Sequence, residues 1–203
     1  MIGFYNYTVW LTYIGMLSSV VGIGFACGGN ITAAVICLMF SGFCDMFDGI
    51  VARTKKDRTD EERRYGIQLD SLSDVVCFGV LPVAIGYNIG ATAWWQVAIM
   101  AAFALAGLIR LAYYNVTEET RQQQTTEKRK HYLGVPITTS ALTVPLLFCF
   151  EKLLGTNFPL AYTLLLLVNG ACFIVPIQVK KPSKTGLAIM LVLGVIFTAC
   201  ILL

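Results

Sequence analysis

Residues 41–53, SGFCDMFDGIVAR, and residues 66–74, GIQLDSLSD, place four aspartates within or beside apolar sequence. The four are Asp45, Asp48, Asp70 and Asp74. An ionised carboxylate in the hydrocarbon region of a bilayer costs roughly 3 kcal/mol or more, so such residues usually face a cavity and have partners. The two stretches therefore predict a polar site enclosed between membrane-spanning helices.

The composition of the whole chain is that of a membrane protein. Hydrophobic residues make up 57% of the 203 positions and charged residues only 13%, whereas about a quarter of the residues in soluble domains are charged. So few charges cannot cover a surface that faces water on all sides, so lipid must act as part of the solvent. The formal net charge of +3 is too small for an extended nucleic-acid-binding surface.

Apolar runs of membrane-spanning length recur along the chain, separated by short polar connections. They lie at 9–27, 31–53, 66–88, 93–115, 136–154, 158–178 and 185–203. We expect an all-α fold, a polytopic transmembrane helix bundle with six core helices and a seventh, C-terminal span. Because no internal repeat is present, we expect residues 1–203 to form a single membrane domain. A polar loop with some helix is expected over residues 116–130.

Basic residues gather in alternate connections. They lie over residues 53–64, 121–130 and 180–184, and only Arg110 and Lys152 stand elsewhere. Loops rich in Lys and Arg remain on the cytoplasmic side of a membrane, so we expect a cytosolic amino terminus and an external carboxyl terminus. The short loops, without a recognisable targeting segment, favour a prokaryotic cell membrane over an internal eukaryotic membrane.

The spacing of the aspartates predicts a metal site. Asp45 and Asp48 stand three positions apart and Asp70 and Asp74 four, so each pair shares one helix face. The two spans run antiparallel, which brings all four carboxylates near the cytosolic membrane surface, where their repulsion requires cations. Hard oxygen ligands favour two Mg²⁺ or Mn²⁺ ions, with Ca²⁺ as a substitute; Zn²⁺ is not expected, because His131 is the only histidine. Taken singly, an aspartate such as Asp70 is alternatively an ordinary helix-end charge.

Small residues stand beside these aspartates. Gly49 and Gly66 would let a ligand approach the backbone closely, and Ala52, one turn after Asp48, keeps the same face shallow. The alternative interpretation is close helix–helix packing through small residues. Arg53 is placed to meet phosphate oxygens or an aspartate; alternatively, it is a cytosolic anchoring charge.

The order of these residues resembles a known signature. Asp45-x-x-Asp48-Gly49-x-x-Ala52-Arg53, followed by Gly66-x-x-x-Asp70-x-x-x-Asp74, is similar to the motif of the CDP-alcohol phosphatidyltransferases. In one departure from that family, residues 54–65 make a longer separation than most members have. We therefore expect a longer cytosolic loop and an unchanged site geometry.

The resemblance implies an integral membrane enzyme that moves a lipid phosphoryl group from a CDP-lipid to an alcohol. It implies that two metal ions are held by Asp45, Asp48, Asp70 and Asp74. It also implies that Asp74 is the general base and that the CDP-lipid site includes Gly49, Ala52, Arg53 and Gly66. Because members of the family are generally homodimers with six core membrane helices, a homodimer is expected.

Three further stretches, residues 69–82, 110–116 and 134–137, are similar to the phosphatidylserine synthase branch of this family. They imply transfer from CDP-diacylglycerol to the hydroxyl of L-serine, giving phosphatidylserine and CMP by direct displacement. Serine carries a carboxylate, so its pocket should contain a cation. Arg110 is the candidate, assisted by Asn115; equally, Arg110 is a structural partner for an aspartate. Lys130 and His131 are further candidates for anion contacts.

Three other interpretations remain open from the sequence, one of which is a catalytically inactive scaffold, although the intact set of four aspartates argues against it. The acceptor is alternatively glycerol 3-phosphate or an inositol phosphate, although a phosphorylated acceptor should need more clustered basic residues than Arg110 and Arg53. A divalent-cation transporter would also place carboxylates in the membrane. Such a protein should continue the polar path through the bilayer, whereas the acids here cluster near one end of their spans.

Overall fold

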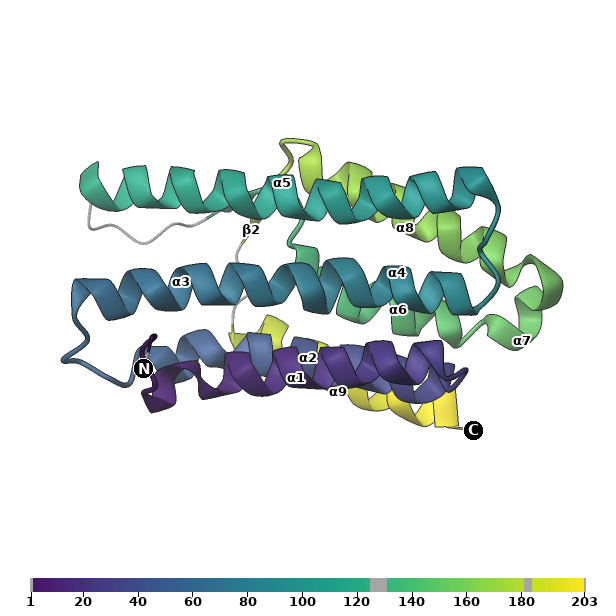
Figure 1. Cartoon of the computed structure of the whole chain (residues 1–203), viewed down its shortest axis with the longest axis horizontal. Coiled ribbons are helices and arrows are strands. Elements are labelled where there is room, and N and C mark those ends of the chain that lie inside the picture. Colours follow the sequence, from purple (N-terminus) through teal and green to yellow (C-terminus); the bar gives the residue numbers. More distant parts are fainter. Residues whose placement is uncertain (1, 125–130, 181–183, 203) are drawn as a thin grey trace.

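The computed structural model describes residues 2–124, 131–180 and 184–202. Long helices lie along the longest axis of the molecule, with connections at both ends (Figure 1). In chain order the elements are η1 (Tyr7–Val9), α1 (Trp10–Cys27), α2 (Ile31–Ala52), α3 (Asp60–Asp74), η2 (Val75–Val80), α4 (Leu81–Asn88), α5 (Trp94–Gln124), β1 (His131–Leu133), η3 (Ile137–Thr139), α6 (Ser140–Phe148), α7 (Glu151–Leu154), η4 (Gly155–Asn157), α8 (Phe158–Ile174), β2 (Gln178–Lys180) and α9 (Lys184–Leu202).

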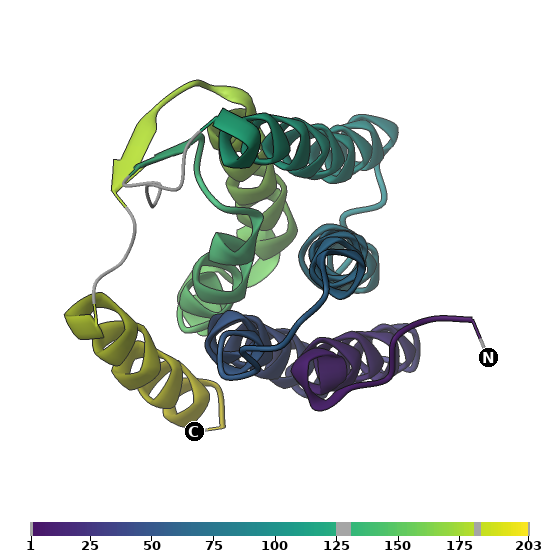
Figure 2. The same cartoon turned by 90° about the vertical axis from the view of Figure 1, so that its left-hand side faces the viewer.

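The helices have the lengths that a membrane requires. Among the described residues, five segments are long and apolar enough to cross one, namely Tyr7–Cys27, Ile31–Ala52, Asp60–Asn88, Trp94–Arg121 and Glu151–Ile174. Within the described part of the chain, two shorter apolar helices accompany them, Ile137–Phe148 and Gly186–Leu202. The expected all-α polytopic bundle is thereby confirmed. The helix α9 lies at the edge of the bundle, where it packs against α2 and α6 (Figure 2).

Helices α1 and α2 pack closely through small residues. A Cβ atom added to Gly22 would lie 2.8 Å from the Cβ of Cys37, and one added to Gly15 would lie 3.1 Å from the Cβ of Cys44. The hydroxyl groups of Ser19 and Ser41 share a hydrogen bond of 2.8 Å across the same contact. Small side chains and interhelical hydrogen bonds are common means of joining helices in membranes, and here they fix α1 against the helix that carries Asp45.

The third helix begins earlier than the hydropathy predicts. The third predicted span begins at residue 66, after a long loop. In the structure α3 begins at Asp60, and the connection covers only residues 53–59. Thr59 caps the helix by accepting from the Glu62 N–H, and the Glu62 side chain accepts from the Thr59 N–H. This capping box stabilises the polar first turns, so the additional residues lengthen the helix, and the prediction of a longer loop was wrong.

A π-helical turn interrupts the central span. The segments α3, η2 and α4 form one continuous rod (Figure 1), in which η2 is a π-helix that starts directly after Asp74. Pro82 follows closely and has no N–H for the helical ladder, while the Leu81 N–H bonds to the Val76 carbonyl in the wider π pattern. Turns of this kind are frequent at functional sites, and this one lies next to an aspartate of the signature.

Two later boundaries also differ from the predicted ones. The span expected at residues 136–154 ends at Phe148, and α7 belongs to the next span. Pro145 weakens the end of α6, and the charged pair Glu151 and Lys152 follows it. The polar stretch expected as a loop from residue 116 is helical to Gln124, as the end of α5. Residues 125–130, including Lys130, lie outside the described residues.

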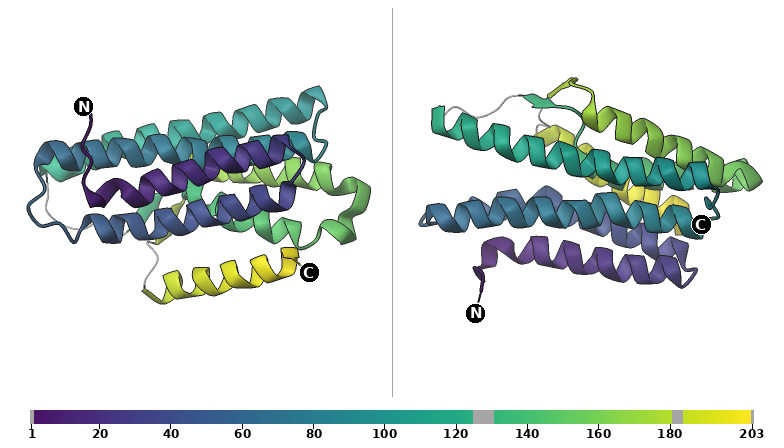
Figure 3. Two further views of the ribbon diagram at one scale, coloured as in Figure 1. Left: turned by 60° about the horizontal axis from the view of Figure 1, so that its bottom comes forward. Right: turned by 45° about the horizontal axis from the view of Figure 1, so that its top comes forward.

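The ends of the bundle differ in what they carry. The N-terminal segment, the α2–α3 connection and the end of α5 lie at one end, whereas the last described residues of α9 lie at the other (Figures 1 and 3). The strand β1 pairs antiparallel with β2, with Tyr132 opposite Val179. The basic connections around residues 53–64 and 121 are thus on the same end, as the predicted topology requires.

Candidate functional site

Three of the four aspartates meet in the interior of the bundle. Asp45 from α2 and Asp70 and Asp74 from α3 each offer a carboxylate oxygen, and these atoms all lie within 4.8 Å of one another. The i, i+4 spacing aligns Asp70 and Asp74 on one face of α3, and the antiparallel α2 presents Asp45 to that face. Asp74 is 8% exposed. This group can hold a metal ion.

Asp48 lies beside this group and contacts it. The carboxyl groups of Asp48 and Asp70 touch, and the Thr12 hydroxyl of α1 donates to Asp48 Oδ2 over 3.1 Å. A void of about 10 Å³, the size of one water molecule, is lined by all four aspartates together with Thr12, Ser41 and Ser73. The predicted convergence of the two acidic pairs is therefore present in the structure.

The donor chemistry fits a hard divalent cation. Within the described residues the polar lining of the void consists of carboxylate and hydroxyl oxygens from α1, α2 and α3, and the sulfur-bearing side chains that border it are Met16, Cys44 and Cys77. Oxygen-only sites suit Mg²⁺, Mn²⁺ and Ca²⁺. Four close carboxylates in an apolar surrounding repel one another strongly, so positive charge is the natural occupant. The residues present therefore fit the expected metal.

A larger cavity opens towards the α2–α3 connection from Asp48 and Asp70. It has a volume of about 130 Å³, and its wall includes the small residues Gly49, Ala52 and Gly66. A Cβ on Gly49 would meet only Arg53 Nη1 at 3.7 Å among the described atoms, but a Cβ on Gly66 would lie 2.6 Å from Arg58 Nη2. The absence of a side chain at residue 66 thus lets an arginine lie against α3.

The expected cationic residues take different places. Arg53 is exposed and attracts the Asp48 carboxylate, but it is not among the described residues that line either cavity. Arg110 lies on α5, close enough to attract Asp45, and its guanidinium is stacked over the Tyr114 ring at 5.8 Å. The structure therefore brings Arg110 near the acidic group, as either of its two interpretations requires.

Asn115 is tied to the middle of the signature. Its Nδ2 donates to Ser71 Oγ over 2.9 Å, and the Ser71 hydroxyl donates back to Asn115 Oδ1 over 3.1 Å. Ser71 directly follows Asp70, so this pair fixes α5 against the acidic face of α3. Neither Arg110 nor Asn115 borders the two described cavities, and their acceptor role stays a prediction.

Three residues at the site were missed by the sequence analysis, namely Thr12, Arg58 and Arg63. Thr12 is a lone polar residue in an apolar run, and its position opposite Asp48 depends on how α1 packs. Arg58 and Arg63 line the larger cavity, yet in the sequence they stand in a charged run that reads as a solvated loop. The capping box at Thr59 was the available signal that this run is helical.

The family model described as CDP-alcohol phosphatidyltransferase matches residues 5–177. The chain belongs to this family. The match includes both cavities and every residue of the signature. The family generally uses divalent metal ions, in agreement with the acidic group at Asp45, Asp70 and Asp74, and the apolar helices identify a multi-pass membrane protein.

Curated relatives from three kinds of organism resemble the chain. It is 40% identical over 122 residues to a CDP-diacylglycerol–serine O-phosphatidyltransferase of Saccharomyces cerevisiae, covering 58% of this chain and 43% of the relative. It is 33% identical over 145 residues to the Helicobacter pylori protein of the same name, covering 69% and 54%. It is 30% identical over 135 residues to the archaetidylserine synthase of Methanothermobacter thermautotrophicus, covering 66% and 54%. The chain spans about half the length of these relatives.

Proposed function

We propose that this protein transfers the phosphatidyl group of CDP-diacylglycerol to the hydroxyl of L-serine, giving phosphatidylserine and CMP. The observation that carries the proposal is the meeting of Asp45, Asp70 and Asp74 within 4.8 Å, beside a cavity walled by the small residues of the signature. Serine as the acceptor is supported by relatives that are named as serine phosphatidyltransferases.

The four aspartates would hold the metal, as two Mg²⁺ or Mn²⁺ ions. When bound, the ions neutralise the diphosphate and favour the departure of CMP. The Thr12 hydroxyl orients Asp48 through its hydrogen bond of 3.1 Å, a form of support that fixes metal ligands in place. The wall at Gly49, Ala52 and Gly66 leaves room for the CDP group, and Arg53, whose guanidinium lies close to Gly49, would meet its phosphates.

The reaction is a direct displacement. The serine hydroxyl oxygen forms a bond to the phosphorus that carries diacylglycerol, and the bond from this phosphorus to the CMP oxygen breaks. Asp74, the most enclosed carboxylate of the group, accepts the hydroxyl proton as general base. Arg110 would pair with the serine carboxylate, and Asn115, locked to Ser71, would supply a second polar contact.

The placement of the chain in the cell follows from its charges. We propose that residues 1–203 form one domain, whose metal end faces the cytosol of a prokaryotic cell, because the basic connections lie at that end. A homodimer is proposed by analogy with the family.

The deciding experiment is CMP release by purified protein in mixed micelles of CDP-diacylglycerol with Mg²⁺ or Mn²⁺. Serine, glycerol 3-phosphate and inositol are compared as acceptors, and Asp74→Asn is the inactive control. Metal-dependent CMP release with serine alone, together with phosphatidylserine in the lipid extract, supports the proposal. Release with another acceptor would reassign the alcohol, and no release from folded protein with any acceptor would refute the enzyme.

A further inference from the structure

The larger cavity has opposite charges at its two ends. Asp48 and Asp70 lie at one end, and Arg58 and Arg63 come from the connection and first turns of α3. Ala52 and Gly66 stand one helical turn from the two aspartates, a rise of about 6 Å. A ligand that fills the cavity therefore contacts the metal-binding carboxylates and, about one helical turn away, the two arginines.

Hydrogen bonds to two main-chain carbonyl groups hold the Arg58 side chain at the wall of this cavity. Its Nη1 donates to the Ala52 carbonyl over 3.4 Å and its Nη2 to the Glu62 carbonyl over 3.2 Å. The Nε atom is buried and has no hydrogen-bond partner within the part of the chain that the structure describes. Gly66 leaves the space that the guanidinium occupies.

Arg58 also differs from its neighbours in charge pairing. Arg63 pairs with Asp60 at 3.6 Å and Arg64 with Glu119 at 3.1 Å, both at exposed positions. No ion pair joins Arg58 to a carboxylate of the described residues. A partly buried guanidinium without a carboxylate partner, at the wall of a cavity, is a ready site for an anionic group.

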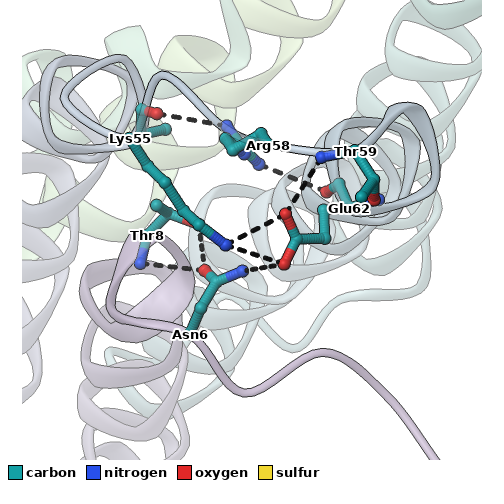
Figure 4. A network of polar contacts seen from close by, with 7 residues as sticks. Asn6, Thr8, Lys55, Arg58, Thr59 and Glu62 are labelled. Carbon is teal, nitrogen blue, oxygen red and sulfur yellow. Dashed lines mark hydrogen bonds and ion pairs between the residues drawn. The ribbon is translucent and has the colours of Figure 1, made fainter.

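A polar network centred on Glu62 holds this arrangement in place (Figure 4). The Glu62 carboxylate accepts from Lys55 Nζ over 2.9 Å and from Asn6 Nδ2 over 3.0 Å, and it closes the cap at Thr59. Asn6 in turn accepts from the Thr8 N–H over 3.1 Å. The N-terminal segment, the connection and α3 are thus joined around the turn that presents Arg58, so little reordering is needed on binding.

We propose that Arg58 binds the CMP half of the CDP-lipid, with Glu62 as the positioning residue that holds it. The inference rests on the proposed function, because it takes the ligand to be a cytidine diphosphate diester. A guanidinium has five N–H donors, and the two backbone bonds leave three for the phosphate oxygens or the acceptor atoms of cytosine. Arg58 stands outside the family signature, so this chain's own α2–α3 connection supplies the contact.

The test separates nucleotide binding from turnover. Arg58→Met, Arg58→Lys and Glu62→Gln are purified in lipid nanodiscs with Mn²⁺, and binding of radiolabelled CMP is measured by equilibrium dialysis without serine. We expect Arg58→Met to weaken CMP binding and raise KM for CDP-diacylglycerol by about tenfold each, the loss of one charge-assisted contact. KM for serine should stay within about twofold. Arg58→Lys and Glu62→Gln should show smaller increases in the same two quantities.

Arg64→Met is the matched control, since it removes an exposed arginine from the first turns of α3, and its CMP affinity and KM values should equal those of the wild type. Unaltered CMP affinity and KM in folded Arg58→Met would overturn the inference while leaving the serine transferase intact. If the wild-type protein binds CMP but transfers nothing to serine, the proposed function fails and the Arg58 contact is still decided by dialysis. If neither Arg58 variant folds, Arg58 is a structural residue and the inference is wrong.

Discussion

At the scale of single residues, the acidic group balances repulsion against metal binding. Asp45, Asp70 and Asp74 place carboxylate oxygens within 4.8 Å, an arrangement that is unfavourable without cations. Repulsion among the carboxylates therefore lowers the free energy of unfolding of the metal-free protein, and bound metal should raise it again. This conflict gives each aspartate two measurable effects of opposite sign.

Asp74→Asn should abolish CMP release, by about 100-fold or more, because it removes both a metal ligand and the proposed base. In metal-free buffer the same variant should melt at a temperature equal to or above that of the wild type, since one repelling charge is gone. Added Mn²⁺ should raise the melting temperature of the wild type and that of the variant much less. Thermal unfolding with and without Mn²⁺ measures both effects.

Asp57→Asn is the control for this experiment, because Asp57 is an exposed carboxylate of the α2–α3 connection that lines neither cavity. It should behave as the wild type in both buffers. An Asp74→Asn protein that loses stability in metal-free buffer and still gains as much from Mn²⁺ as the wild type would contradict the assignment of Asp74 as a ligand.

Thr12→Val should weaken metal binding without removing a ligand. The Thr12 hydroxyl is the donor to Asp48 Oδ2 at 3.1 Å, and valine has nearly the same shape without the hydrogen bond. Loss of such a supporting bond typically reduces metal affinity by about 10-fold or more. The Mn²⁺ concentration for half-maximal activity should rise accordingly, while Thr12→Ser, which keeps the hydroxyl, should stay near the wild type. Equal Mn²⁺ requirements in Thr12→Val and wild type would refute this role.

At the scale of the helices, the sequence predicts what repeats along a chain and misses what depends on packing. The apolar runs located the spans, and the two aspartate spacings identified a common face. The predicted start of α3, residue 66, lies six residues after the observed start at Asp60. Hydropathy does not identify polar helical turns, and here such turns are stabilised by a capping box. Thr12 and Arg58 were missed for a related reason, since their partners are distant in sequence and come close only when α1, α2 and α3 pack.

Gly42→Ala tests how tightly α2 is positioned. A Cβ at residue 42 would lie 2.6 Å from the Cβ of Ala141 on α6, and neither rigid helix can yield without moving Asp45, three residues further on. We expect a loss of about 1–3 kcal/mol in the free energy of unfolding and a higher Mn²⁺ requirement. The double variant Gly42→Ala with Ala141→Gly restores the space and should recover both quantities.

Gly24→Ala is the matched control within α1, because a Cβ there meets nothing within 4 Å among the described atoms. Replacing a helical glycine by alanine without a clash stabilises a helix by about 0.5–1 kcal/mol, so this variant should be neutral or more stable. Equal destabilisation at residues 24 and 42 would show that the effect of Gly42→Ala is not a packing effect.

At the scale of the whole molecule, function depends on which end of the bundle faces the cytosol. The acidic group, the larger cavity and the α2–α3 connection lie in the half of the bundle that also carries Arg58, Arg63 and Arg121. In the proposed reaction the headgroup of the CDP-lipid, serine and CMP are polar. They must therefore reach the cavity from the aqueous side next to the α2–α3 connection. The positive-inside rule gives the orientation in which they do.

Accessibility to a membrane-impermeant maleimide tests that orientation. Lys56→Cys lies in the α2–α3 connection and Thr156→Cys in η4 at the opposite end of the bundle, and both positions are exposed. In a background with the seven native cysteines replaced by serine, intact cells should be labelled at residue 156 only. Residue 56 should react only after the membrane is permeabilised, because the basic connection is retained inside. The reverse pattern would place the metal-binding end outside the cell, away from the cytosolic substrates, and would contradict the proposed reaction as well as the topology.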